Sequence, residues 1–186
     1  MPRPLPFPLP RKHGLPVAEG RLPWQVRLRW AVDGDLPALR ALYATTREQE
    51  LAPVPWAQVV KDRFVDEQFA LQHHHYLTHF ADADFLVVDS REGLAGRLYR
   101  WRAPDDAPPG ASDILVDICL LPQWRGRGIG EALLAATLAQ GAERRRDVCL
   151  HVHATNVRAR QLYERLGFTC TGEAGLHVEM RWRAAA

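Results

Sequence analysis

The residues whose spacing most clearly suggests chemistry are three glycines at alternate positions, Gly126, Gly128 and Gly130. They follow an aliphatic stretch, residues 114–121, that predicts a buried strand. From Ile129 onward, apolar residues recur at the spacing of a helix. Glycines let a backbone approach a ligand closely, and the free N–H groups at a helix N-terminus attract an anion. The stretch therefore predicts an anion-binding turn between a strand and a helix.

The spacing of the glycines selects among known phosphate-binding turns. A dinucleotide-binding fingerprint needs glycine or alanine where Glu131 stands, and a P-loop needs a Gly-Lys-Ser/Thr sequence that this segment lacks. The pattern that fits is Arg/Gln-x-x-Gly-x-Gly/Ala, supplied by Arg125, Gly128 and Gly130. This segment resembles the pyrophosphate-binding turn of the GCN5-related N-acetyltransferases (GNATs); the alternative is an ordinary connection whose glycines serve only the turn. The resemblance implies that acyl-CoA is bound by Arg125, Gly126, Arg127, Gly128, Ile129 and Gly130.

A second motif lies about thirty residues further on, in the order found in that family. The helix beginning at Asn156 resembles the family pattern Asn-x-x-Ala/Arg-x-x-Leu-Tyr-x-x-x-Gly-Phe, with Ala159, Leu162, Tyr163 and Gly167-Phe168 at the matching positions. The resemblance implies an α/β fold, the acyl-CoA N-acyltransferase (GNAT) fold. That fold is a mixed, mostly antiparallel sheet of about seven strands with helices on both faces.

The resemblance also assigns roles to individual residues. Acyl transfer from a thioester needs a deprotonated amine, hydrogen-bond donors for the oxyanion and a proton for the leaving thiolate. In the family two strands separate, and the thioester lies against the backbone of Ile118, Cys119 and Leu120. Asn156 would bind the pantetheine arm, or cap its helix, or do both. Tyr163 would be the general acid, and the alternative is that it only packs against the cofactor.

The general base has three candidates. His151 stands at the strand position where the family members that acetylate ribosomal proteins carry a glutamate, and histidine titrates near neutral pH. Asp117 lies on the facing strand and is the rival. A water chain that ends in solvent would need neither residue.

Composition limits the classes of protein that fit. The chain has 186 residues, enough for one domain with a core, and 47% of them are hydrophobic. A net charge of +2 is too small to indicate nucleic acid or an anionic membrane surface, and no apolar run is long enough to span a membrane. Cys119, Cys149 and Cys170 are an odd number, each within a predicted strand, which indicates buried free thiols and a cytoplasmic location.

The chain divides into an arm and a domain. Residues 1–24 contain seven prolines, which predicts an extended, flexible arm, with a proline-recognising partner as an alternative. Residues 25–186 form the predicted acetyltransferase domain. Its expected elements are a strand at 25–31, helices at 36–47 and 56–80, strands at 84–89, 96–102 and 114–121, a helix from 129 that ends at Gly141, a strand at 148–153, a helix at 156–166, and strands at 168–171 and 176–182.

Two clusters invite a functional interpretation that we do not adopt. His75 and His79 have the i,i+4 spacing of a metal pair, and His73 and His74 are adjacent, but no nearby Cys or carboxylate completes a ligand set, so no metal is expected. The arginines at 144–146 are flanked by acids at a helix end, where cations are favoured, so we expect a solvated helix end.

The sequence therefore predicts an N-acetyltransferase that moves an acetyl group from acetyl-CoA, its cosubstrate, to a primary amine by direct transfer in a ternary complex. The alternatives are a non-catalytic acyl-CoA-binding regulator on the same fold, and a nucleic-acid-binding protein that uses the arginines at 125–127 and 144–146. We expect a small-molecule or peptide amine as acceptor, chosen by the first two helices and by residues 104–112. Neither nucleic acid nor a membrane is expected as a partner, and a homodimer, common in the family, stays open.

Overall fold

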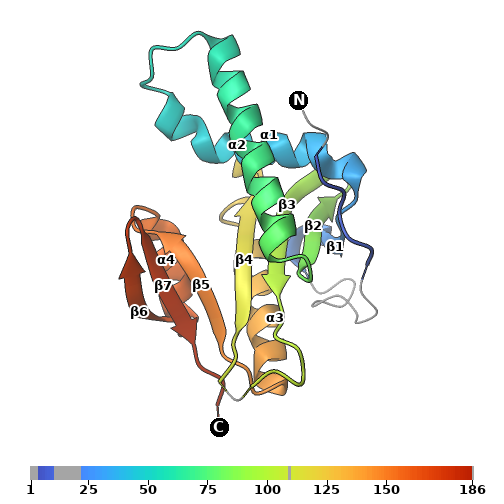
Figure 1. Cartoon of the computed structure of the whole chain (residues 1–186), viewed down its shortest axis with the longest axis vertical. Coiled ribbons are helices and arrows are strands. Elements are labelled where there is room, and N and C mark those ends of the chain that lie inside the picture. Colours follow the sequence, from blue (N-terminus) through green and yellow to red (C-terminus); the bar gives the residue numbers. More distant parts are fainter. Residues whose placement is uncertain (1–3, 11–21, 109, 186) are drawn as a thin grey trace.

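A computed structural model describes residues 4–10, 22–108 and 110–185. Its centre is a seven-stranded sheet with the strand order β1-β2-β3-β4-β5-β7-β6. Helices cover both faces of this sheet (Figure 1). The elements are β1 (Arg27–Trp30), α1 (Leu36–Leu51), α2 (Gln58–His79), β2 (Asp84–Ser90), β3 (Gly93–Trp101), β4 (Asp113–Leu120), α3 (Ile129–Glu143), β5 (Val148–His153), α4 (Val157–Arg165), β6 (Thr169–Ala174) and β7 (His177–Trp182). Short 3₁₀ turns lie at η1 (Pro23–Gln25), η2 (Asp33–Asp35) and η3 (Pro122–Trp124). The order of strands and helices and the mixed sheet confirm the predicted fold.

The sheet separates two hydrophobic cores. On one face, α3 buries Ile129 and Leu133 completely, in the same cluster as Leu98 of β3 and Leu150 of β5. On the other face, α1 and α2 cover β2 and β3, and Leu39 of α1 is fully buried there. Each such side chain contributes about 1.5–3 kcal/mol by leaving water. The site-forming strands are thus held from both sides.

Helix α2 buries one of its faces. Val65, Phe69 and Leu77 face the core beneath the helix. Val60 and Leu71 are 46% and 62% exposed. The helix is therefore an outer layer over α1 and the sheet rather than an element enclosed on two sides.

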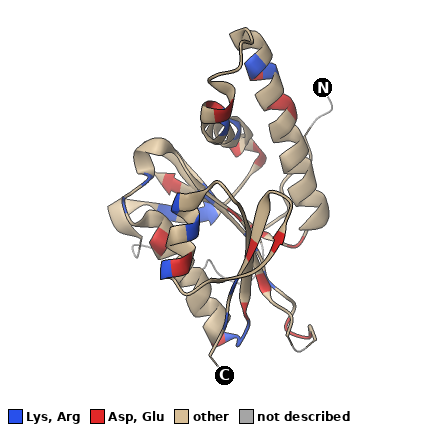
Figure 2. Cartoon of the chain, turned by 90° about the vertical axis from the view of Figure 1, so that its left-hand side faces the viewer, with Lys and Arg blue, Asp and Glu red and all other residues tan. Residues whose placement is uncertain are grey.

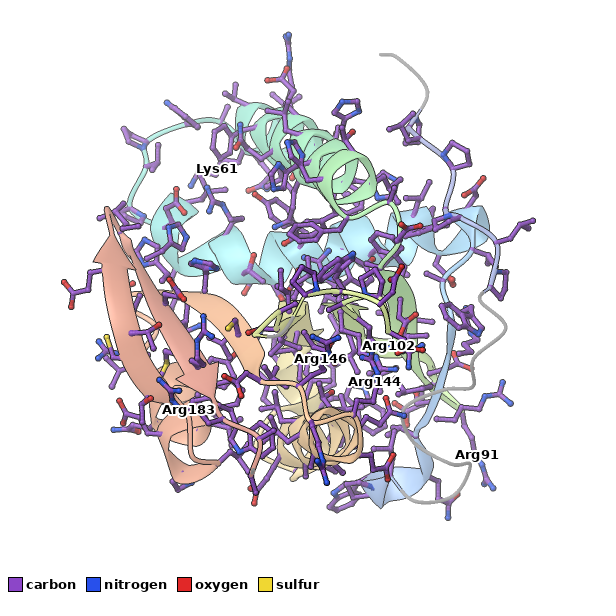
Figure 3. All side chains as sticks on the ribbon, turned by 60° about the horizontal axis from the view of Figure 1, so that its bottom comes forward. Lys61, Arg91, Arg102, Arg144, Arg146 and Arg183 are labelled. Carbon is purple, nitrogen blue, oxygen red and sulfur yellow. The ribbon has the colours of Figure 1, made fainter. Side chains whose placement is uncertain are left out.

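Two expectations for the end of α3 are wrong. The helix does not end at Gly141 but continues to Glu143. A Cβ atom on Gly141 would lie 2.9 Å from the Arg146 carbonyl oxygen and 3.0 Å from Val148, so this glycine serves close packing instead of termination. Nor are the arginines a solvated helix end, because Arg144 and Arg146 bind the loop at 104–112. Figure 3 shows the two side chains close together there.

Part of the proline-rich arm has defined contacts. The Phe7 ring lies 5.0 Å from the His73 ring and 5.7 Å from that of Phe85. The Phe7 N–H donates to Asp33 at 2.9 Å, and His73 Nε2 donates to the Leu5 carbonyl at 2.8 Å. Burial lowers the pKa of His73, so the ring stays neutral at neutral pH. The remainder of the expected flexible arm, at 1–3 and 11–21, lies outside the described residues.

The histidines near the end of α2 have ordinary contacts. His75 and His79 stack with their ring centroids 4.2 Å apart. Among the described residues, no group of three or more histidine, cysteine or acidic side chains is placed to hold a metal ion. No helix in the described part of the chain is long and apolar enough to cross a membrane. The thiols are free, but Cys170 is exposed, which corrects the expectation that all three cysteines are buried.

Candidate active site

The central feature of the site is the separation of β4 from β5. The two strands run parallel but pair only from Asp113↔Val148 to Leu115↔Leu150. Just beyond this point Val116 is an extra residue, because the register with β3 passes from Arg100↔Leu115 to Tyr99↔Asp117. Such a bulge bends its strand. In the described chain no strand then pairs with residues 116–120 on the β5 side, and Figure 1 shows β4 and β5 diverging.

The residues at the separation combine apolar side chains with free backbone groups. Ile118, Cys119 and Leu120 are only half-buried, although similar side chains elsewhere in β2 and β3 are fully buried. The backbone of Leu121 bonds to Ala95 of β3, so by alternation Cys119 also faces β3, whereas the N–H groups of Ile118 and Leu120 face the separation. These two N–H groups are candidate oxyanion donors for a thioester between the strands. Burial raises the pKa of the Cys119 thiol to about 11. This thiol is therefore protonated at neutral pH and is a poor nucleophile.

The glycine-rich turn adjoins the end of β4. Gly126 and Gly128 have φ of 74° and 76°, a region that L residues with a side chain rarely adopt. Gly128 is the N-cap of α3, and a Cβ there would meet no atom within 4 Å, so the turn is open at this point. The first N–H groups of α3 have no acceptor within the helix. Together they form a small electropositive cradle for an anion.

Three arginines surround this turn, and sequence reasoning identified only two of them. Arg125 donates to the Leu120 carbonyl at 2.8 Å and to Thr45 of α1 at 3.2 Å, which ties the turn to β4 and α1. The Arg127 guanidinium lies over the rings of Trp24 and Trp124. Arg158 of α4 was missed, and its guanidinium lies 3.4 Å from where a Gly126 Cβ would stand. Its signal was its position two residues after Asn156, at the start of the second motif.

Helix α4 supplies the two residues that the second motif predicts. The side-chain Oδ1 of Asn156 accepts the Ala159 N–H at 3.2 Å and caps the helix, which leaves the side-chain NH₂ group to donate elsewhere. Tyr163 is 7% exposed. Burial, with the nearby Asp117 and Cys119, raises the Tyr163 pKa, so the phenol is protonated across the neutral range. Because Asp117 and Cys119 belong to β4, Tyr163 lies close to β4, although its own helix, α4, follows β5.

The two candidate bases are in different environments. Asp117 Oδ2 lies 2.5 Å from the guanidinium of Arg97 and accepts the Tyr76 hydroxyl at 3.1 Å. The Arg97 side chain is 4% exposed, so this is a buried ion pair that links β3, β4 and α2. His151, by contrast, is exposed on β5. Its neighbours Leu150 and Val152 face the α3 core, so His151 projects from the opposite face, where Asp117 also lies.

The loop at 104–112 is far from this separation. It joins β3 to the start of β4, where β4 and β5 are paired. Arg146, which lies between α3 and β5, donates to the loop carbonyls of Pro104, Asp105, Ala107, Pro108 and Ala111 at 3.1–3.4 Å. The expectation that this loop chooses the acceptor is therefore wrong, because the loop lies at the opposite end of β4. The other region expected to choose the acceptor, α1 and α2, does lie beside the site. Thr45 of α1 accepts a bond from Arg125, and Tyr76 of α2 donates to Asp117.

Comparisons with known proteins agree with this geometry. Residues 81–170 match the family model "Acetyltransferase (GNAT) domain". Solved structures with the same fold include "paia n-acetyltransferase from thermoplasma acidophilum in complex with coenzyme a". It is 16% identical, has a TM-score of 0.62, and the match covers 85% of this chain and 98% of that one. A structure from Pyrococcus horikoshii, PH1933, is 19% identical at the same TM-score, over 87% and 99% of the two chains. At these identities the likeness shows the fold.

Similar curated proteins are named mycothiol acetyltransferase. The one from Mycobacterium leprae is 37% identical over 89 residues, which is 44% of this chain and 28% of that protein. The one from Corynebacterium aurimucosum is 40% identical over 103 residues, or 50% and 33% of the two chains. The chain thus spans about a third or less of the length of these relatives.

Proposed function

We propose that this chain, which carries a GNAT acetyltransferase domain, transfers an acetyl group from acetyl-CoA to a primary amine. The observation that supports this best is the separation of β4 from β5 beside an open glycine turn. The turn suits a pyrophosphate, and the separated strands suit the acyl-bearing arm attached to it. A nucleic-acid-binding role is disfavoured, because Arg144 and Arg146 are engaged with the loop. Figure 2 also shows basic and acidic residues interspersed along the elements that face the viewer.

The reaction is direct transfer in a ternary complex. The general base takes a proton from the amine, whose nitrogen attacks the thioester carbonyl carbon; the carbonyl electron pair moves to oxygen, where the N–H groups of Ile118 and Leu120 stabilise it. The carbonyl bond then re-forms, the C–S bond breaks, its electron pair leaves with sulfur, and the thiolate takes the proton of the Tyr163 hydroxyl. The raised pKa of Tyr163 keeps this proton in place until the thiolate forms. The protonated thiol of Cys119 argues against an acetyl-cysteine intermediate.

We assign the general base to His151. Asp117 already holds Arg97 and Tyr76 through one oxygen, and its loss would leave a buried guanidinium without its partner, so we assign Asp117 a structural role. His151 is exposed on the same face of the sheet and has no such role among the described residues. A water chain remains the alternative that its substitution tests.

The acceptor enters from the side of α1 and α2. Because the curated relatives are named mycothiol acetyltransferase, the panel of candidate acceptors includes a mycothiol-type amine together with amino acids, polyamines and peptide N-termini. The experiment measures thiol release from acetyl-CoA with each acceptor. Turnover with one of them supports the enzyme. Tight binding of acetyl-CoA without turnover on any acceptor supports the regulator, the alternative on the same fold.

Gly128→Glu tests the anion site directly. The change places a side chain and a negative charge where the pyrophosphate would lie, and each charge-assisted bond lost contributes about 1.5–3 kcal/mol. We expect acetyl-CoA affinity, measured by calorimetry, to fall by about tenfold or more. Gly110→Glu is the matched control, because Gly110 also has a positive φ (88°) and no atom near its Cβ position, but lies in the loop at 104–112. Equal affinity in both folded variants would refute the assignment of the turn.

A further inference from the structure

The segment just before β1 has a strained and exposed tryptophan that the proposed chemistry does not use. Trp24 is 60% exposed. Trp24 and Gln25 both have left-handed backbones, with φ of 61° and 53°. Residues with a side chain seldom adopt this conformation, and such strained positions concentrate at ligand sites. Trp24 is the last residue of the predicted proline-rich arm, 1–24, and neither acetyltransferase motif includes it.

Contacts with the glycine turn hold the indole of Trp24 in place. Its Nε1–H donates to the Arg127 carbonyl at 3.1 Å. The Arg127 guanidinium lies 4.8 Å from the Trp24 ring centroid and 5.0 Å from that of the buried Trp124. Trp24 is thus fixed beside the turn while most of its ring stays open to solvent. A fixed, open aromatic surface is what a planar base requires for stacking.

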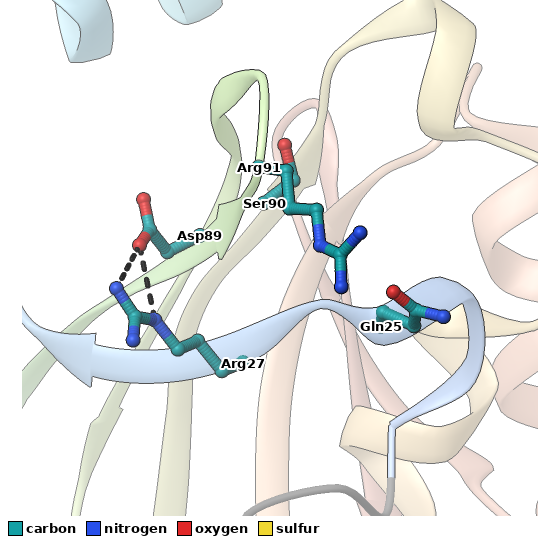
Figure 4. Close-up of a pocket in the computed structure, with 5 residues that line it drawn as sticks. All are labelled: Gln25, Arg27, Asp89, Ser90 and Arg91. Carbon is teal, nitrogen blue, oxygen red and sulfur yellow. Dashed lines mark hydrogen bonds and ion pairs between the residues drawn. The ribbon is translucent and has the colours of Figure 1, made fainter.

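A hollow of about 300 Å³ begins at the next residue. Its walls are Gln25 and Arg27 on one side and Asp89, Ser90 and Arg91 on the other (Figure 4). Arg27 is paired with Asp89 at 3.0 Å. Arg91 makes no hydrogen bond or ion pair with any described residue, and Figure 4 shows its guanidinium extended toward Gln25. Among the described residues, the Arg91 guanidinium is therefore a cation at the hollow without a hydrogen-bond or ion-pair partner, and it is available to a ligand.

The hollow and the turn lie at the same end of the sheet. Arg27, at the start of β1, pairs with Asp89, near the end of β2. The β2–β3 turn follows, and Ala95 at the beginning of β3 accepts the Leu121 N–H at 2.9 Å, just after β4 ends. A ligand whose pyrophosphate lies on the glycine turn can thus extend its other end over Trp24 toward Arg91.

We propose that Trp24 and this hollow bind the adenosine 3′-phosphate end of acetyl-CoA. Adenine stacks on the open face of the Trp24 indole, and the 3′-phosphate pairs with Arg91. This inference rests on the proposed function, because a pyrophosphate on the turn fixes where the adenosine begins. It adds Trp24 and Arg91 to the proposed cofactor site. Trp24 lies outside residues 81–170, which match the family model.

Calorimetry with two ligands tests the stacking. For Trp24→Ala we expect affinity for acetyl-CoA to fall about tenfold or more, as for loss of a base–aromatic stack. Affinity for S-acetyl-4′-phosphopantetheine, which lacks the adenosine, should stay within about twofold. Trp24→Phe keeps a ring and should bind acetyl-CoA within about threefold of wild type. Trp56→Ala, which removes another exposed tryptophan (45%), should change neither affinity.

A second pair of ligands tests the phosphate contact. Arg91→Gln should lower the affinity for acetyl-CoA about tenfold and leave the affinity for 3′-dephospho-acetyl-CoA unchanged, because only acetyl-CoA has the 3′-phosphate that pairs with Arg91. If Trp24→Ala lowers the affinities for acetyl-CoA and S-acetyl-4′-phosphopantetheine equally, Trp24 is a positioning residue of the turn and the proposal is overturned. Unchanged affinity for acetyl-CoA in this variant also overturns it. If wild type binds none of these ligands, the proposed function itself fails. Melting temperatures confirm folding, which removal of an exposed ring should not disturb.

Discussion

The two ends of β4 differ in how completely their polar groups are paired. At the start, Asp113 accepts the Ala103 N–H and two bonds from Arg144, all at 3.0 Å, and its own N–H bonds to Asp147 at 2.8 Å. At the other end, residues 116–120 have no strand beside them on the β5 side in the described chain. One end is therefore fixed and the other is open.

The difference shows how an open site persists in a well-packed sheet. Unpaired backbone groups and half-exposed aliphatic side chains cost free energy, so separated strands tend to close. Here the bulge at Val116 directs β4 away from β5, and Arg144 and Arg146 fasten the end where the strands still pair. The fastened contacts are concentrated at one end, and the proposed acetyl-CoA site lies at the other. The following substitutions test this division.

Tyr163→Phe should affect the open end most. The change keeps the ring packing and removes only the proton donor, so turnover on a good acceptor should fall about 10²–10⁴-fold, while coenzyme A affinity holds within a few-fold. The effect should lie toward the lower value, since a thiol of pKa about 8.5 leaves readily. Steady-state kinetics under conditions where chemistry limits the rate measures the loss.

The pH dependence adds a control for Tyr163. Because burial raises its pKa above the usual value of about 10, the wild-type phenol should stay protonated below pH 10, and its titration should not reduce the rate there. The deficit of the variant should shrink as acidity supplies protons from water. Turnover within threefold of wild type at neutral pH would make Tyr163 a packing residue.

Asp113→Ala should affect the fixed end instead. It removes the acceptor of the buried Ala103 N–H and the ion pair between Asp113 and Arg144, which then keeps only the Ala103 carbonyl and the exposed Asp105, so we expect the free energy of unfolding to fall by about 3 kcal/mol. Acetyl-CoA affinity of the folded variant should be unchanged. Denaturant titration and calorimetry measure the two quantities.

The control for Asp113 is an exposed pair. Arg63→Ala removes the i,i+4 partner of Glu67 on the surface of α2, where such pairs contribute only about 0.3–0.5 kcal/mol. Similar small losses in both variants would show that the Asp113 cluster does not fasten the sheet.

His151→Gln should lower turnover about 10²-fold at neutral pH if His151 is the base. The loss should shrink as the pH approaches the pKa of the acceptor amine, about 10.4 for a lysine-like amine, because the amine then loses its proton to water. His153→Gln is the matched control, two residues along the same strand. An equal loss of turnover in His151→Gln and His153→Gln, or no loss in either variant, would favour the water chain.

Cys119→Ser should have the smallest effect. With a thiol pKa of about 11, Cys119 is not a nucleophile at neutral pH, so turnover should stay within about threefold. Mass spectrometry after incubation with acetyl-CoA should find no acetyl group on this residue in wild type. An acetylated Cys119 that transfers its acetyl group to the amine would replace direct transfer with a two-step mechanism.

Much of the fold could be predicted because its signals are local. Glycine at positions of positive φ marked the turn at 126–128, and helical spacing marked α3 beyond it. Asn156 caps α4 through a residue only three positions away. The order of all eleven helices and strands followed from such short-range patterns. Helix ends were less accurate, as Gly141 shows, because a glycine kept for packing has the same sequence signal as one that ends a helix.

The contacts between distant residues could not be predicted from the sequence. Asp117 is a plausible base in the sequence, but the fold gives it the buried Arg97 as a partner, twenty positions away on another strand. Trp24 lies on the glycine turn 103 positions away in the sequence, and Arg146 organises a loop about 40 positions before it. These contacts depend on strand register and on the angle at which helices cross the sheet. Neither leaves a periodic pattern in the chain. The sequence therefore determined the elements and the glycine turn, and packing determined which charges are structural and which face the candidate site.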